Sequence, residues 1–136
     1  MRAIFWIDLA VFLGSGVFVC SQWQWTVRYL VGIGMAVVSF TLWMLARIQL
    51  GSSFSVRAEA KALVTTGLYS KLRHPIYLFG GLAYLGLFLA WGKLLLTLAF
   101  LALIIPTQIV RLRKEEAVLE KAFGDGYRRY RANTWF

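Results

Sequence analysis

Segment 66–77 brings together residue types that bind or orient a charged ligand. It contains Arg73 and His74, the only histidine of the chain, and Pro75 follows directly. Proline suits the first turn of a helix, so we expect a helix to begin there, with free amides and a positive dipole end that favour an anion. Tyr77 would lie on the same edge, near His74. The other interpretation is a membrane-anchoring motif, because Tyr and Arg are common at the headgroup level.

A second group of charged residues lies on the apolar side of a helix that we expect over residues 111–123. The apolar arc of this helix holds Leu112, Val118, Leu119, Ala122 and Phe123. Arg111 and Glu115 fall within that arc, one turn apart, and Glu116 lies at its edge. Burying a charge is costly unless it is paired or meets a ligand. The pair is therefore either a salt bridge that closes the tail onto the 51–74 loop or part of a binding site, and we favour the site.

The residues after this helix combine aromatic rings with positive charge. Residues 124–126, Gly-Asp-Gly, predict that the helix stops. Tyr127 and Tyr130 then alternate with three arginines. This composition fits either a segment that lies on anionic lipid or a lid over a ligand pocket.

These groups must be positioned by apolar helices, because 60% of the 136 residues are hydrophobic and only 15% are charged. Four apolar spans are expected, at residues 4–19, 26–50, 75–91 and 94–110. The sequence predicts an all-α integral membrane protein with four transmembrane helices, in which a cytoplasmic loop and an amphipathic C-terminal helix form the site. We expect one domain over 1–136, with two spans in 1–50 and the ligand-binding core in 51–136.

The net charge of +9 indicates orientation rather than nucleic-acid binding, because no soluble domain remains to carry a basic face. Of the 15 Lys and Arg residues, only Arg28 and Lys93 would lie outside if the N-terminus is cytoplasmic. Both termini and the site are then predicted on the cytoplasmic side. A metal cluster is not supported, since the single Cys and the single His lie far apart in the sequence.

Three motifs together resemble a known enzyme family. They are residues 63–69 (LVTTGLY), residues 73–77 (RHPIY) and residues 115–130, which begin with Glu-Glu and contain Phe-Gly, Tyr127 and Tyr130. The combination covers about residues 50–130 and is similar to the isoprenylcysteine carboxyl methyltransferase and phospholipid methyltransferase family. The resemblance implies an integral membrane enzyme that uses S-adenosylmethionine.

The resemblance also implies site residues. The implied cofactor-binding residues are Lys61, Ala62, Leu63, Val64, Tyr69, His74, Pro75, Tyr77 and Glu115. Arg111 corresponds to a substrate-orienting arginine, and Arg111 and Glu115 are the catalytic candidates. The residue chemistry agrees, because His74 suits the carboxylate of the cofactor and Glu115 suits its ammonium or ribose diol. Methyl transfer mainly requires alignment and exclusion of water, so no dedicated nucleophile is expected.

The acceptor is expected to be a lipophilic or prenylated molecule or a membrane lipid. Arg111 favours an isoprenylcysteine-type carboxylate, while methylation of a phospholipid amine or of a thiol stays open. A nicotinamide-dependent sterol-type reductase is a weaker alternative, because such enzymes have many more spans. A non-catalytic membrane scaffold is the third alternative.

Overall fold

The computed structural model describes residues 2–23, 25–51 and 64–135, with side chains from residue 6 onward in the first helix. The elements are α1 (Arg2–Ser21), α2 (Val27–Leu50), a short 3-10 turn η2 (Gly67–Ser70), α3 (Pro75–Trp91), α4 (Leu94–Phe123) and α5 (Asp125–Ala132). Across these ranges the only β-type pairing is an isolated parallel bridge between Leu72 and Trp135. The all-helical prediction is confirmed for this part of the chain.

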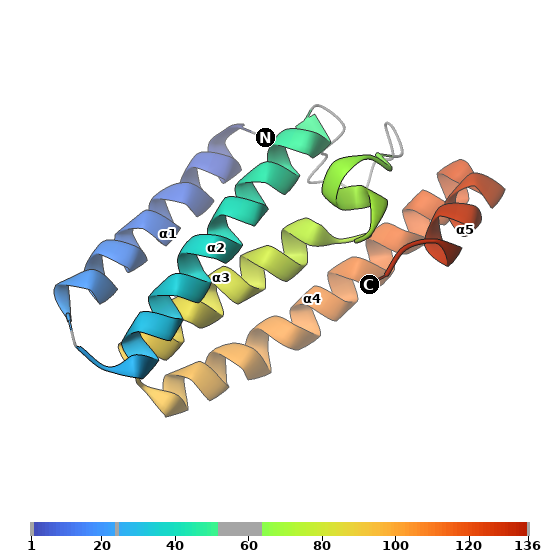
Figure 1. Cartoon of the computed structure of the whole chain (residues 1–136). Helices are drawn as coiled ribbons and strands as arrows, with labels where there is room; N and C mark the ends of the chain where they lie inside the picture. Colours follow the sequence, from blue (N-terminus) through green and yellow to red (C-terminus); the bar gives the residue numbers. More distant parts are fainter. Residues whose placement is uncertain (1, 24, 52–63, 136) are drawn as a thin grey trace.

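Helices α1 to α4 run side by side, and the chain reverses direction from each to the next (Figure 1). We call the end where α2 stops and α3 begins the loop end. Sharp reversal at the opposite end is achieved by Gly92, whose φ of 74° is left-handed and whose amide bonds to the carbonyls of Phe88 and Leu89. Helices α3 and α4 are therefore joined by a tight hairpin.

Helices α2 and α3 touch backbone to backbone. A Cβ added to Gly32 would lie 2.5 Å from the amide nitrogen of Ala90, and one added to Gly86 would lie 2.6 Å from that of Ala36. Such approach is possible only without side chains, as is common where helices pack within membranes. This contact makes α2 and α3 the rigid centre of the bundle.

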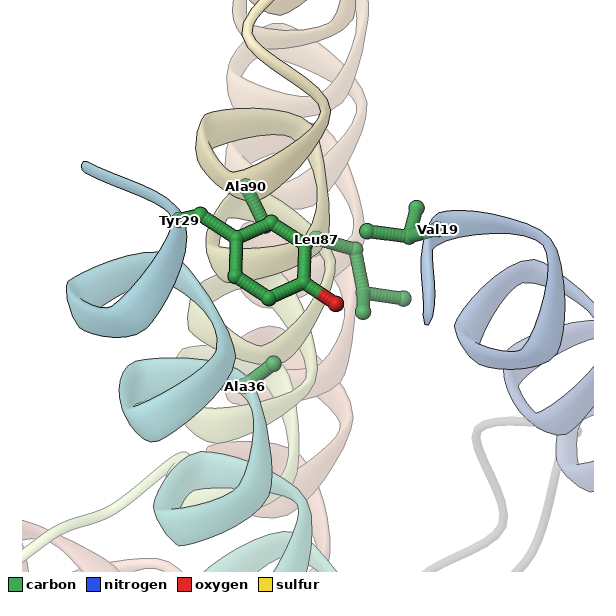
Figure 2. Packing of buried hydrophobic residues seen from close by; sticks show 5 residues of the cluster. All are labelled: Val19, Tyr29, Ala36, Leu87 and Ala90. Carbon is green, nitrogen blue, oxygen red and sulfur yellow. The ribbon is translucent and has the colours of Figure 1, made fainter. Parts of the chain in front are cut away.

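The buried core is small and lies beside this contact. Figure 2 shows Tyr29 and Ala36 of α2 against Leu87 and Ala90 of α3, with Val19 of α1 closing the side. Many large apolar side chains point outward instead, among them Val17, Val27, Leu95 and Leu103. Outward-facing apolar surface of this extent fits contact with lipid rather than with water.

Two of the described helices, α2 and α4, are long and apolar enough to cross a membrane. The helix α3 and the stretch Trp6–Ser21 of α1 are apolar but shorter. Length and composition therefore support two of the four expected spans directly.

Helix α4 is a single helix of 30 residues that joins the fourth apolar span to the expected 111–123 helix. It ends at Gly124, where φ is 48°. The sequence predicted both the continuation and the stop, but not the helix α5 that begins immediately afterwards. At the loop end, η2, the start of α3, the second half of α4 and α5 come together.

Candidate functional site

The structure brings Arg73 and His74 against Glu116 of α4. The Nε2 atom of His74 lies 3.4 Å from Oε1 of Glu116, and Nη1 of Arg73 lies 3.2 Å from the same oxygen. His74 is buried, and burial is the main reason that its pKa is lowered, against the pull of Glu115 and Glu116. A neutral imidazole at neutral pH can donate one hydrogen bond to Glu116, which fixes the ring beside the start of α3.

This arrangement adds a contact of the tail that the sequence did not predict. The ion pair that closes the tail onto the loop is made by Glu116, whereas the sequence suggested Arg111 with Glu115 as the structural alternative. Glu116 was placed only at the edge of the apolar arc, and its role was missed. His74 is the N-cap residue of α3 but its side chain makes no capping hydrogen bond. The first amides of α3 are therefore not capped by that side chain.

Glu115, the neighbouring residue, has a buried carboxylate oxygen, Oε2, with no hydrogen-bond partner among the residues that the structure describes. The hydroxyl of Tyr69 is buried and unpartnered in the same sense. The pKa of Tyr69 is raised, first by burial and then by the negative charge of Glu115. Buried polar atoms without partners are rare, so this pair marks a place where a ligand with hydrogen-bond donors fits.

Arg111 lies on the next part of α4 and stacks on Tyr77. Its Cζ atom is 5.2 Å from the centroid of the Tyr77 ring, a cation–π contact. The rings of His74 and Tyr77 are 6.1 Å apart, so the two residues share an edge as expected. Arg111 is exposed in the molecule, however, and not buried as its place on the apolar arc predicted. The reason is that it borders an opening between the helices.

That opening is a cavity of about 280 Å³ between α1, α2, α3 and α4. Its polar and charged lining residues are Asp8, Arg47, Tyr77, Gln108 and Arg111. Its aromatic lining residues, further from the loop end, include Phe12, Phe40, Tyr84 and Phe100. Along α3 it extends from Ile76 to Tyr84, roughly 12 Å at 1.5 Å per residue. Such a cavity suits a slender amphipathic molecule whose polar group stays near Arg111.

The C-terminal segment packs over the loop that carries His74. The hydroxyl of Tyr130 donates to the carbonyl of Tyr69 at 2.6 Å. The amide of Trp135 donates to the carbonyl of Lys71 at 2.8 Å, and the amide of Arg73 donates to the carbonyl of Trp135 at 3.4 Å. The tail is therefore attached to the site, as a lid would be, and does not extend away from it.

From the other side, α2 supports η2. The Oε1 atom of Gln49 accepts a hydrogen bond from the amide of Leu68 at 2.7 Å. Gly67 has a φ of 61°, and a Cβ there would collide with the Gln49 side chain. Gln49 could not be found from the sequence, because only the folded chain brings the end of α2 to this turn.

The remaining predicted residues are only partly placed. Lys61, Ala62 and Leu63 lie outside the described residues. Val64 is half-buried just before the turn, and Pro75 is fully buried at the first position of α3. Their roles toward a ligand stay predictions.

Comparison with known proteins identifies the family of this chain. A model of the phospholipid methyltransferase family matches residues 27–126, from the start of α2 into α5, and leaves α1 outside. The protein-S-isoprenylcysteine O-methyltransferase of Schizosaccharomyces pombe (strain 972 / ATCC 24843) is 36% identical over 91 residues, which cover 63% of this chain and 39% of that relative. The match thus spans about two fifths of the relative's length. No solved structure matches. Since the family match covers most of the chain and includes His74, Arg111, Glu115 and Glu116, this chain belongs to the phospholipid methyltransferase family.

Proposed function

We propose that this protein is an S-adenosylmethionine-dependent membrane methyltransferase that acts on a lipophilic acceptor. The observation that carries the proposal is the buried Oε2 of Glu115, which has no hydrogen-bond partner among the described residues and lies one helical turn from Arg111 at the border of the cavity. The hydroxyl of Tyr69 is likewise buried without a partner among the described residues. The first part of this site would bind the hydrogen-bond donors of a cofactor at the Glu115 carboxylate, and the cavity would hold an amphipathic acceptor. A two-substrate enzyme needs both parts side by side.

The residues at the loop end fit the cofactor. Glu115 would accept hydrogen bonds from its ammonium group or ribose hydroxyls, and Tyr69 would provide a further polar contact. The first amides of α3, beside His74, suit its carboxylate. Lys61, Ala62, Leu63 and Val64 are proposed to complete the site from the adjacent segment. When bound, S-adenosylmethionine supplies a methyl group activated by a sulfonium centre.

The acceptor is proposed to enter the cavity with its polar group toward Arg111. The guanidinium, held over Tyr77, would orient an anionic group, and the aromatic lining would take an apolar chain and exclude water. This favours an isoprenylcysteine-type carboxylate, the group that the name of the yeast relative indicates for that enzyme. Transfer to a phospholipid amine or to a thiol is the alternative.

We further infer that all four long helices cross the membrane, with the loop end and both termini in the cytoplasm. Support comes from the outward-facing apolar side chains of α1, α2 and α4. Arg28 lies against Gly92, next to Lys93, so these two basic residues share the end opposite the site. All other Lys and Arg residues are assigned to the loop end by the chain order, as the positive-inside rule expects.

Calorimetric titration of the purified protein with S-adenosylmethionine tests the cofactor assignment. Glu115→Gln is expected to weaken binding about tenfold or more, because it removes a charge-assisted hydrogen bond. His74→Ala is expected to do the same by releasing Glu116 and the start of α3. Glu120→Gln is the matched control, since Glu120 lies on the same helix but pairs with Arg128 at the surface. Unchanged affinity in both site variants would refute the assignment.

Two further outcomes would replace the proposal. Binding of a nicotinamide cofactor in place of S-adenosylmethionine would indicate a reductase. Tight binding of S-adenosylmethionine without transfer of labelled methyl to any component of a total lipid extract would indicate a non-catalytic role. Transfer to a lipid carboxylate, abolished by Arg111→Gln, is the expected result.

A further inference from the structure

Asp8 is an acidic residue within the apolar helix α1, outside the region that the family model matches. Ionisable side chains inside membrane helices are costly and are retained where they serve a site. Asp8 borders the acceptor cavity, and its Oδ2 atom lies 3.6 Å from Nη1 of Arg47 on α2. None of the groups assigned above to the cofactor requires it.

The two partners are exposed to different degrees. The Arg47 side chain is 12% exposed, and its Cζ atom lies 4.9 Å from the ring centroid of Trp43, so Arg47 is packed into the wall of the cavity. The Asp8 side chain is 49% exposed. Asp8 therefore compensates the positive charge of Arg47, and the Asp8 carboxylate also borders the cavity.

The described lining holds three formally charged residues, Asp8, Arg47 and Arg111. With Asp8 and Arg47 compensating each other, Arg111 gives the described lining residues a net positive charge, and Glu115, one turn further along α4, is not among those residues. A ligand group with a single negative charge balances this charge. A doubly charged group would leave a negative excess close to Asp8, and a cationic group would add to the positive excess.

We propose that Asp8 is a specificity-determining residue that restricts the cavity to lipids whose polar group carries one negative charge, such as a carboxylate, and that disfavours phosphate monoesters. The inference rests on the proposed function in that the cavity is taken to hold the methyl acceptor. Asp8 touches neither the cofactor nor the reacting atoms in this account. Asp8 instead sets the net charge of the cavity lining around the acceptor.

The test is competitive lipid binding, measured by native mass spectrometry of the protein in neutral detergent. The probes are hexadecanoate and hexadecyl phosphate, which share a chain length and differ in charge at pH 8.5. The wild-type protein is expected to retain mainly the carboxylate. Asp8→Asn raises the net charge of the lining and is expected to shift the bound ratio about tenfold toward the phosphate. Ser15→Ala, on the same helix and bonded to the Val11 carbonyl, should leave the ratio unchanged because it alters no charge.

Removing Arg47, the other member of the ion pair, reverses the expected direction of the change in the bound ratio of the two lipids. Arg47→Gln leaves Asp8 uncompensated, so both probes should bind more weakly and the ratio should move further toward the carboxylate. The double variant Asp8→Asn/Arg47→Gln restores the original net charge and should restore the wild-type ratio. If Asp8→Asn does not fold, Arg47→Gln and the double variant decide the question.

A ratio that stays constant across the folded variants would overturn the proposal, as would failure of the wild-type protein to bind hexadecanoate. No methyl donor is present in this experiment. A failed cofactor titration with a charge-dependent lipid ratio would therefore reject the methyltransferase proposal and retain the role of Asp8. The opposite combination would reject only the role of Asp8.

Discussion

Replacing Gly32 by alanine tests the central contact of the bundle. The added Cβ would lie 2.5 Å from the Ala90 nitrogen and 2.7 Å from the Gly86 oxygen, and both are backbone atoms that cannot rotate away. Gly34, two residues further along the same helix, has nothing within 4 Å of an added Cβ. Gly32→Ala and Gly34→Ala therefore make the same chemical change in one helix and differ only in the space available.

The magnitudes follow from this difference. Forcing an extra carbon into a packed interface costs about 1–3 kcal/mol, and a contact between backbones belongs at the upper end. Replacing glycine by alanine also stabilises the helix by about 1 kcal/mol, because alanine has the higher helix propensity, and this offsets part of the cost. We expect Gly32→Ala to lose about 2 kcal/mol and Gly34→Ala to gain up to about 1 kcal/mol, using the same principles. For a chain of this size, these values correspond to a fall of about 6 °C and a rise of up to about 3 °C in the unfolding midpoint.

The assay is thermal unfolding of the purified variants in one detergent, followed by tryptophan fluorescence. Gly86→Ala should behave like Gly32→Ala, because its Cβ would lie 2.6 Å from the Ala36 nitrogen. Gly81→Ala, on the same helix as Gly86 and with open space around it, is its control. If both clashing variants unfolded at the temperature of their controls, the close approach of α2 and α3 would be wrong.

Three other predictions concern the loop end. Folding lowers the pKa of His74, so the unfolded chain binds a proton more readily than the folded chain does. The free energy of unfolding should therefore be highest above about pH 6.5, where His74 is neutral in both states, and should fall as the pH drops below that value. Unfolding midpoints measured from pH 7.5 to 5 should fall less in His74→Gln than in the wild type. Glu116→Gln should cost about 1–2 kcal/mol, because its pair with Arg73 is mostly buried, whereas the exposed Glu120→Gln should cost under about 0.5 kcal/mol in the same denaturation experiment. Tyr130→Phe should cost about 0.5–1.5 kcal/mol and speed tryptic cleavage of the tail, and an unchanged cleavage rate would show that its bond to Tyr69 does not hold the tail in place.

Local signals were sufficient to predict most of the helices. The expected start of α3 at Pro75 and its end before Gly92 agree with the structure, since proline at a first turn and a left-handed glycine act through neighbouring residues alone. The continuation of α4 into the charged segment followed from its apolar arc. The helix α5 was missed because it has only eight residues and includes Gly126, and its main anchor is the burial of Tyr127 against the rest of the fold.

The pairing of side chains could not be predicted in the same way. Glu115 and Glu116 differ by about 100° around the helix, so the rotation of α4 decides which of them meets His74, and that rotation is set by packing between helices. Asp8 is the only charge of the 4–19 span, and Arg47 lies near the end of the 26–50 span. Their contact depends on which helices are neighbours and on their relative height, which no local pattern encodes.

The unbroken length of α4 has a consequence for the host membrane. Its 30 residues rise about 45 Å, whereas the hydrocarbon layer of a bilayer is about 30 Å thick. Counted from Leu94, Arg111 lies about 26 Å and Glu115 about 32 Å along the axis, and the helix continues through Pro106 without interruption. Helix α4 therefore tilts and shifts as one rod, so its membrane-embedded part moves together with the part that carries Arg111 and Glu115. Lipid chain length should then act as a control on turnover, with the highest rate in bilayers whose thickness leaves Glu115 level with the start of α3.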